Sequence, residues 1–131
     1  MSVETFLTEV KFDDKGLVPA LAVDAETKAV LMVAYMNRDT LKESLETGKM
    51  VYWSRSRGKR WLKGEQSGNF QMIKRAAIDC DGDCLLFHVD QQGGAACHTD
   101  YSSCFYRVWN GSNLTVEGEK VFDPDKTYGK S

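Results

Sequence analysis

Five consecutive residues, Asp79-Cys80-Asp81-Gly82-Asp83, form the densest group of potential metal ligands in the chain. Side chains of an extended segment alternate between two sides, so the three aspartates project to one side and Cys80 to the other. Carboxylate oxygens suit hard cations such as Mg²⁺, whereas a thiolate suits Zn²⁺. The alternation therefore predicts that this short segment serves two different metals.

Two other interpretations of this segment compete with metal binding. Asp and Gly are common in turns, so a solvated hairpin turn explains the same composition. An EF-hand loop would also place aspartates at alternate positions, but counting from Asp79 puts Cys84 where the turn glycine belongs and Asp90 where the bidentate Glu belongs. We reject the EF-hand interpretation.

A second group of candidate ligands begins at Cys97 and ends at Cys104. Taken alone, these cysteines are more simply explained as small buried hydrophobic residues. Together with Cys80 they provide three thiolates, which would leave the fourth position of a zinc site open for a water whose pKa falls toward about 7. A closed structural site would instead recruit Cys84 or His98, and we assign Cys84 to packing.

His98 follows the candidate ligand Cys97 directly. A neutral imidazole there could accept a proton from an activated water or donate one to a leaving nitrogen, although an ordinary loop histidine is the simpler interpretation. His88 lies within an apolar run, which favours a structural role for it.

A basic segment covers residues 54–69. Its candidate substrate-binding residues are Ser54, Arg55, Ser56, Arg57, Trp61, Lys63 and Ser67. Arginine forms forked hydrogen bonds to phosphate, and tryptophan offers a stacking face for a base, so the segment suggests a nucleotide with more than one phosphate. A solvated loop or single-stranded RNA binding would use the same residue types. The net charge of -2 favours a small ligand over nucleic acid or a membrane surface.

The elements that position these residues fit within 131 residues, which indicates a single domain over 1–131. A hydrophobic fraction of 42% is typical of a globular protein. The N-terminus has no basic start followed by an apolar run, so we expect a cytoplasmic protein. Four cysteines within a short stretch of such a protein indicate metal binding or catalysis.

The apolar pattern predicts an α+β fold, mainly antiparallel, with one main helix at about 38–47. Residues 19–36 are typical of a hairpin, and Asn37 and Gly48 are suited to begin and end the helix. Further strands are expected at 50–54, 69–78, 85–89 and 104–109, with a loop at 91–94 and a short strand and loosely held tail after Asn110.

In combination, these motifs resemble the phosphoribosyl-AMP cyclohydrolase family. The resemblance rests on VLMVAYMN at 30–37, YWSRSRGKRWLKGEQSG at 52–68, DCDGD at 79–83 and GGAACHTDYSSCFYR at 93–107. It implies an intertwined homodimer with one zinc and one magnesium per subunit. Magnesium would be held by Asp79, Asp81 and Asp83, and zinc by Cys97 and Cys104 with Cys80 of the opposite subunit.

Two positions depart from the pattern of the family: Asp100 stands where glycine is usual, and Asn69 where histidine is often found. Neither departure removes a proposed ligand, but Asp100 adds negative charge near the expected phosphates or metals. The chain after Arg107 is too short for the second domain that many relatives carry, so we expect a monofunctional enzyme.

The resemblance implies hydrolytic opening of the adenine ring of 1-(5-phosphoribosyl)-AMP between ring nitrogen 1 and carbon 6. A zinc-activated water would attack, magnesium would assist, and the product would be the phosphoribosylformimino aminoimidazole carboxamide ribotide of the third step of histidine biosynthesis. One rival is a zinc-dependent nucleotide deaminase, whose H-x-E and P-C-x-x-C signature is absent from the sequence. The other is a structural zinc module that binds RNA, which requires a closed four-ligand site.

Overall fold

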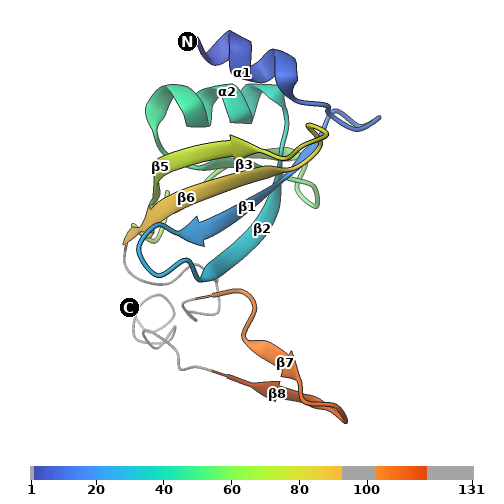
Figure 1. Ribbon diagram of the computed structural model, residues 1–131. Helices are drawn as coiled ribbons and strands as arrows, with labels where there is room; N and C mark the ends of the chain where they lie inside the picture. Colours follow the sequence, from blue (N-terminus) through green and yellow to red (C-terminus); the bar gives the residue numbers. More distant parts are fainter. Residues whose placement is uncertain (1, 93–102, 118–131) are drawn as a thin grey trace.

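The computed structural model of the chain describes residues 2–92 and 103–117, which form a curled six-stranded sheet, two helices packed together on one side of it, and a separate hairpin (Figure 1). The helices are α1 (Val3–Glu9) and α2 (Arg38–Thr47). The sheet contains β1 (Val18–Asp24), β2 (Val30–Met36), β3 (Val51–Ser54), β4 (Lys59–Leu62), β5 (Gln71–Ile78) and β6 (Leu85–Gln91), and the hairpin contains β7 (Arg107–Trp109) and β8 (Leu114–Val116).

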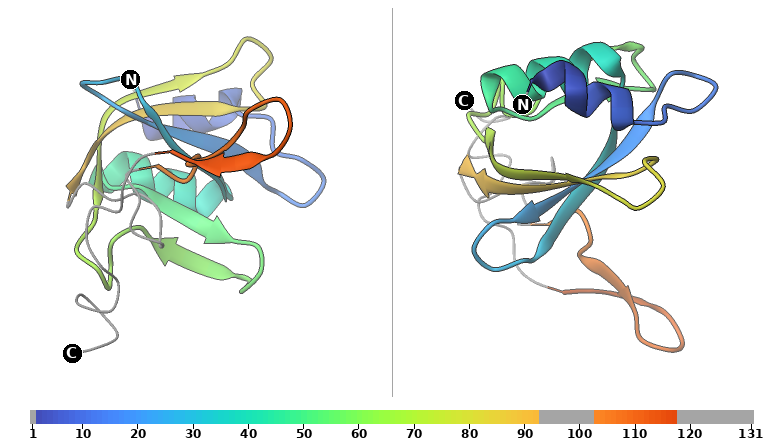
Figure 2. Two further views of the ribbon diagram at one scale, coloured as in Figure 1. Left: turned by 90° about the horizontal axis from the view of Figure 1, so that it is seen from below. Right: turned by 45° about the horizontal axis from the view of Figure 1, so that its top comes forward.

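The sheet runs in the order β4-β3-β2-β1-β6-β5. Neighbouring strands are antiparallel except β1 and β6, which pair in parallel. The sheet curls, because the start of β5 also meets the chain that precedes β3: Met50 N–H donates to the Gln71 carbonyl at 2.9 Å, and Ile73 N–H donates to the Gly48 carbonyl at 2.7 Å. The two views of Figure 2 follow this curvature from below and from the helical side.

The core lies between the helices and the sheet. Alternate residues of β1 and β6 point into it, as expected for strands with one face covered. Leu7 of α1 and Leu41 of α2 cover them, each no more than 1% exposed. Among the helices of the described residues, none combines the length and the apolar character needed to cross a membrane.

The predicted α+β class is confirmed, as are the hairpin at 19–36 and the helix at 38–47. The side chain of Asn37 accepts from Thr40 N–H at 2.8 Å, and Gly48 ends α2 with a left-handed φ of 80°. The strands predicted around 50–54, 69–78 and 85–89 are present as β3, β5 and β6, and β8 is the short strand expected after Asn110.

Other expectations need correction. The prediction of one main helix misses α1, which Ser2 caps by accepting from Thr5 N–H. The sequence pattern also does not predict β4 inside the basic segment, nor the parallel pair of β1 and β6. The strand expected at 104–109 is shorter and begins only at Arg107. Residues 93 and 94 of the expected loop and the tail from 118 lie outside the described residues.

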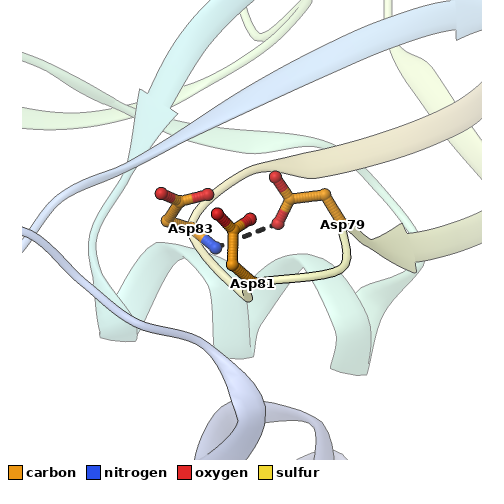
Figure 3. A group of neighbouring side chains, drawn as sticks. All are labelled: Asp79, Asp81 and Asp83. Atoms are coloured by element: carbon orange, nitrogen blue, oxygen red, sulfur yellow. Dashed lines mark hydrogen bonds between the residues drawn. The ribbon is translucent and has the colours of Figure 1, made fainter.

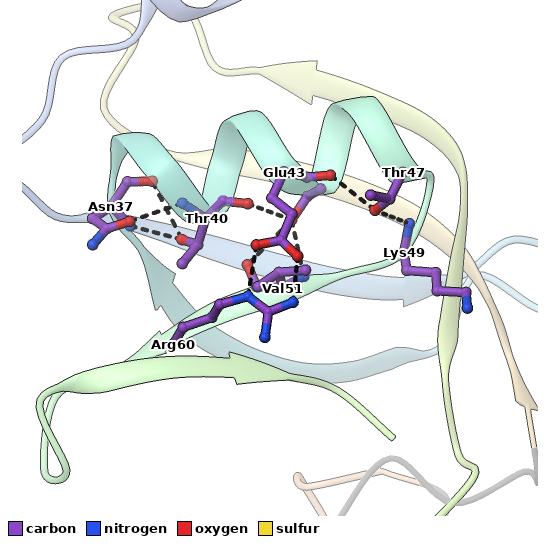
Figure 4. A network of polar contacts seen from close by, with 8 residues as sticks. Asn37, Thr40, Glu43, Thr47, Lys49, Val51 and Arg60 are labelled. Atoms are coloured by element: carbon purple, nitrogen blue, oxygen red, sulfur yellow. Dashed lines mark hydrogen bonds and ion pairs between the residues drawn. The ribbon is translucent and has the colours of Figure 1, made fainter. Parts of the chain in front are cut away.

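Helix α2 holds the β3–β4 hairpin in place through polar contacts (Figure 4). The Ser44 hydroxyl accepts from Val51 N–H at 2.9 Å and donates to the Val51 carbonyl at 3.1 Å. Arg60 of β4 donates to both carboxylate oxygens of Glu43, from Nε at 2.6 Å and also from Nη2. This hydrogen bonding lowers the pKa of Glu43 and raises that of Arg60, as expected for a bidentate ion pair.

The segment after α1 braces the turn between β5 and β6. Lys11 N–H donates to the carbonyl of Gly82 at 2.7 Å. Gly82 has a φ of +80°, and a Cβ placed on it would lie 2.7 Å from the carbonyl oxygen of Glu9. Only glycine satisfies both the backbone conformation and this close approach.

We therefore predict that Gly82→Ala lowers the free energy of unfolding more than Gly16→Ala does. Gly16 is the matched control, because its φ of +76° carries the same backbone cost while a Cβ there would meet nothing within 4 Å. The additional loss for Gly82→Ala should be about 1–3 kcal/mol, as for other overpacked sites. Urea denaturation of both variants measures the difference, and equal losses would contradict the brace.

Candidate functional site

A cavity of about 580 Å³ opens beside the β3–β4 hairpin. It brings together six of the seven residues predicted to bind substrate: Ser54, Ser56, Arg57, Trp61, Lys63 and Ser67. The seventh, Arg55, lies on another side of the hairpin. The volume of the cavity falls within the range of about 300–1,000 Å³ that is usual for small-molecule sites.

The electrostatic character of this cavity is positive. Its lining contains four cations and one carboxylate: Arg57, Lys59, Arg60, Lys63 and Glu65. Of these cations, Arg60 is paired with Glu43, which does not line the cavity. Lys63 is only 6% exposed. In the cavity wall its ammonium adds positive charge, which suits an anionic ligand such as a phosphate.

Aromatic packing and a glycine turn shape the walls. The ring of Trp61 lies 5.5 Å from that of the buried Tyr52, and the Lys63 ammonium lies 5.6 Å from the Trp61 ring centroid. At Gly64 an added Cβ would lie 2.3 Å from the backbone nitrogen of Phe70. The absence of a side chain at Gly64 therefore lets the two ends of this turn approach and close the cavity wall.

The acidic turn gathers Asp79, Asp81 and Asp83 between β5 and β6 (Figure 3). One carboxylate oxygen from each lies within 4.8 Å of the others, and the three side chains are exposed. Among the described residues this is the only group of three or more His, Cys, Asp or Glu side chains so arranged. The all-oxygen donor set fits a hard cation such as Mg²⁺.

Hydrogen bonds fix the shape of this turn. One oxygen of Asp79 accepts from the backbone N–H groups of Asp83 at 3.0 Å and Cys84 at 3.2 Å. Desolvation raises the pKa of Asp79, but the hydrogen bonds that Asp79 accepts have the larger combined effect, so the pKa of Asp79 is lowered. The pKa of Asp83 is raised, mainly by its hydrogen bonding with Asp79. Three adjacent carboxylates resist full ionisation together, and a bound cation would relieve that repulsion.

The described cysteines lie on two segments, with Cys80 and Cys84 in the turn between β5 and β6 and Cys104 before β7. Cys80 and Cys104 are exposed thiols, whereas Cys84 is half-buried. Burial raises the pKa of the Cys84 thiol, and the negative charge of the nearby aspartates raises it further. A raised pKa disfavours the thiolate, which agrees with a packing role for Cys84. The predicted ligand Cys97 and the predicted catalytic residue His98, together with Asp100, lie outside the described residues.

Cys80 and Cys104 are not brought together within one chain. Cys104 N–H donates to the Leu31 carbonyl at 2.6 Å, and the strand pairing places Leu31 about level with Ala76 of β5. Cys80 lies four residues beyond Ala76, roughly 13 Å along the strand, and three strand spacings of about 4.8 Å separate β2 from β5. Two sulfurs on one zinc lie within about 4.6 Å, so this arrangement does not allow both to bind the same ion.

The acidic turn and the cavity are similarly separated. Asn69, which lines the cavity, precedes β5, whereas Asp79 follows it. The eight residues of β5 span roughly 25 Å at about 3.3 Å per residue. A ligand in the cavity of one chain is therefore remote from the aspartates of the same chain.

Two features of the site escape sequence reasoning. The contact of Lys11 with Gly82 is a backbone hydrogen bond between distant segments, and the residue types at these two positions do not predict it. The imidazole Nδ1 of His88 is buried and has no hydrogen-bond partner among the described residues. Its alternating position in β6 places His88 on the face opposite Phe87, away from the core.

Comparison with known proteins places these features in a family. Residues 32–106 match the family described as phosphoribosyl-AMP cyclohydrolase. A phosphoribosyl-AMP cyclohydrolase of Salinibacter ruber is 55% identical over 95% of this chain and 98% of its own length, and one of Chlorobaculum parvum is 55% identical over 97% and 93%. A histidine biosynthesis bifunctional protein of Thermoanaerobacter pseudethanolicus is also 55% identical, over 96% of this chain and 58% of its own length. The chain belongs to the phosphoribosyl-AMP cyclohydrolase family.

Proposed function

We propose that this protein hydrolyses phosphoribosyl-AMP in histidine biosynthesis, opening the adenine ring between nitrogen 1 and carbon 6. The observation that carries the proposal is the 55% identity over nearly the full length of relatives named for this activity. The positive cavity lined by six predicted substrate residues supports it, because the substrate is a nucleotide with two phosphates.

The chemistry of the proposed reaction is the addition of one water. The water oxygen bonds to carbon 6, the bond between carbon 6 and nitrogen 1 breaks, and the exocyclic amine is retained in a carboxamide. One proton of the water must reach nitrogen 1. We assign this transfer to His98, since imidazole exchanges protons near neutral pH.

Two metals complete the proposed site. Asp79, Asp81 and Asp83 would hold magnesium, which suits their oxygen donors, and Cys80, Cys97 and Cys104 would hold zinc. Bound zinc supplies a water acidic enough to serve as a nucleophile near neutral pH. The residues of the chain then bind and orient the substrate: Arg57 and Lys63 pair with phosphate, and Trp61 offers its face to the base.

We further propose a homodimer in which each zinc site takes Cys80 from one subunit and Cys97 and Cys104 from the other. The separation of Cys80 from Cys104 within one chain supports this arrangement. A partner subunit would also bring its acidic turn to a cavity that lies roughly 25 Å away within one chain.

The β7–β8 hairpin supports the same dimer. Figure 1 shows it projecting from the body of the chain. The large apolar side chains of the hairpin and of the segment just before it are exposed: Phe105 56%, Trp109 62%, Leu114 55% and Val116 59%. A two-stranded hairpin with an uncovered apolar surface is marginally stable by itself. A second copy of the chain would cover it.

The activity itself is tested by incubating the purified protein with phosphoribosyl-AMP and following the ultraviolet change of ring opening. We expect turnover that a chelator abolishes, with no ammonia released, because ring opening retains every nitrogen. Release of ammonia would instead identify a deaminase. Absence of any reaction in zinc- and magnesium-loaded protein would reject the proposed function.

The zinc ligands are tested by metal analysis of dialysed variants. We predict about one zinc per subunit in wild type, because three thiolates bind Zn²⁺ strongly, and a large loss in Cys80→Ser and in Cys104→Ser. Cys84→Ser is the matched control, since Cys84 lies on the same turn but is half-buried, and it should keep its zinc. Equal zinc contents in all three variants would refute the assignment.

Sharing of the site is tested by mixing Cys80→Ser with Cys104→Ser. Each homodimer lacks one thiolate in every site and should be nearly inactive, whereas a heterodimer contains one intact site of two. Random reassortment makes about half of the dimers heterodimers, so activity should recover to roughly a quarter of wild type. If the co-refolded variants stay inactive while identically treated wild type recovers, the site is not shared.

A further inference from the structure

The β3–β4 hairpin separates two cavities. The first is the positive cavity of about 580 Å³ already described, and the second, of about 650 Å³, lies against β2. The second cavity is lined by Val33, Ala34, Tyr35, Trp53, Ser54, Arg55, Ser56 and Trp61. Ser54, Ser56 and Trp61 line both cavities and so form their common boundary.

Each cavity has an arginine of its own. Arg55 lines only the second cavity and Arg57 only the first, although a single residue separates them in the sequence. Contacts at the hairpin tip hold this division: Arg57 N–H donates to the Ser54 hydroxyl at 3.3 Å, and Gly58 N–H donates to the Ser54 carbonyl at 2.8 Å. The turn therefore directs Arg55 and Arg57 into different cavities.

Arg55 is positioned by an aromatic ring. Its guanidinium carbon lies 3.9 Å from the centroid of Tyr35, which is the geometry of a cation–π contact. A cation–π contact does not use the N–H donors of a guanidinium, so Arg55 can still form a forked hydrogen bond to phosphate. The remaining walls of the second cavity are largely apolar and aromatic.

The first cavity differs in charge. Lys59 and Lys63 accompany Arg57 there, whereas Arg55 is the only charged residue that lines the second cavity. The two cavities are similar in size, arginine lines each of them, and the aromatic residue Trp61 lies at their boundary. This arrangement fits a ligand that has two anionic ends and a flat centre.

The substrate named under the proposed function has this shape, and the inference rests on that function. Phosphoribosyl-AMP carries one ribose phosphate on nitrogen 9 and another on nitrogen 1, at opposite ends of the purine. We propose that the two phosphoribosyl arms bind in separate cavities, one phosphate at Arg55 and the other at Arg57, with the purine at the boundary formed by Trp61. A nucleotide with only one phosphoribosyl arm occupies one cavity and makes no phosphate contact in the other. The pair of cavities is therefore selective for adenine that carries two phosphoribosyl groups.

The test compares Arg55→Ala and Arg57→Ala with two ligands: phosphoribosyl-AMP as substrate and AMP as a competitive inhibitor with a single arm. Both variants should raise the Michaelis constant about 10- to 100-fold, the equivalent of losing a hydrogen bond to a charged group. Only one of the two should weaken inhibition by AMP. The double variant should show the product of the two single effects, because separate phosphates behave independently.

Arg38→Ala is the matched control, since Arg38 is exposed, lines neither cavity and pairs with Glu4. It should leave both constants unchanged. Two results would show that one phosphate site uses both arginines and that the division is wrong. One is an equal loss of AMP inhibition in Arg55→Ala and Arg57→Ala. The other is a Michaelis constant of the double variant no higher than that of the more impaired single variant. Wild-type constants in Arg55→Ala, with an active wild-type enzyme, would also overturn the division while leaving the proposed function intact. If wild type neither turns over the substrate nor binds AMP, both fail.

Discussion

The length of β5 is the constraint on which the rest of the site depends. A strand rises by about 3.3 Å per residue and does not shorten, so the eight residues of β5 keep the acidic turn at one end and the basic cavity at the other. Opposite charges on one chain are thereby kept from neutralising each other. Carboxylates remain available to a cation, and arginines to phosphate, until a second copy brings them together as proposed.

Ion pairing and packing decide which charged residues are left for ligands. Arg60 has the same charge as Arg57 and lies in the same segment, yet both oxygens of Glu43 hold it against α2. Its work is to anchor the hairpin. That hairpin carries the boundary between the two cavities. The ion pair of Arg60 with Glu43 and the serine contacts at the hairpin tip therefore help to position Arg55 and Arg57.

Local chemistry predicts much of this arrangement from the sequence, and long-range contacts account for what it misses. The Asn37 cap, the Gly48 stop and the apolar runs that become β1 and β6 are local patterns, and each appears where expected. Residue types likewise indicate the cluster of Asp79, Asp81 and Asp83 and the cavity-lining serines and cations. The parallel pairing of β1 with β6, the division between Arg55 and Arg57 and the contact of Lys11 with Gly82 depend on how distant segments meet, which no local pattern encodes.

The backbone contact between Lys11 and Gly82 ties the acidic turn to the beginning of the chain. Helix α1 has only seven residues, and terminal helices open locally more readily than a central sheet. Opening of α1 would release the carbonyl of Gly82 and loosen the carboxylates on either side of it. By thermodynamic linkage the reverse would also hold. If the proposed magnesium binds and tightens the turn, it would slow hydrogen exchange of the Lys11 amide, and the N-terminal segment would then report on metal occupancy.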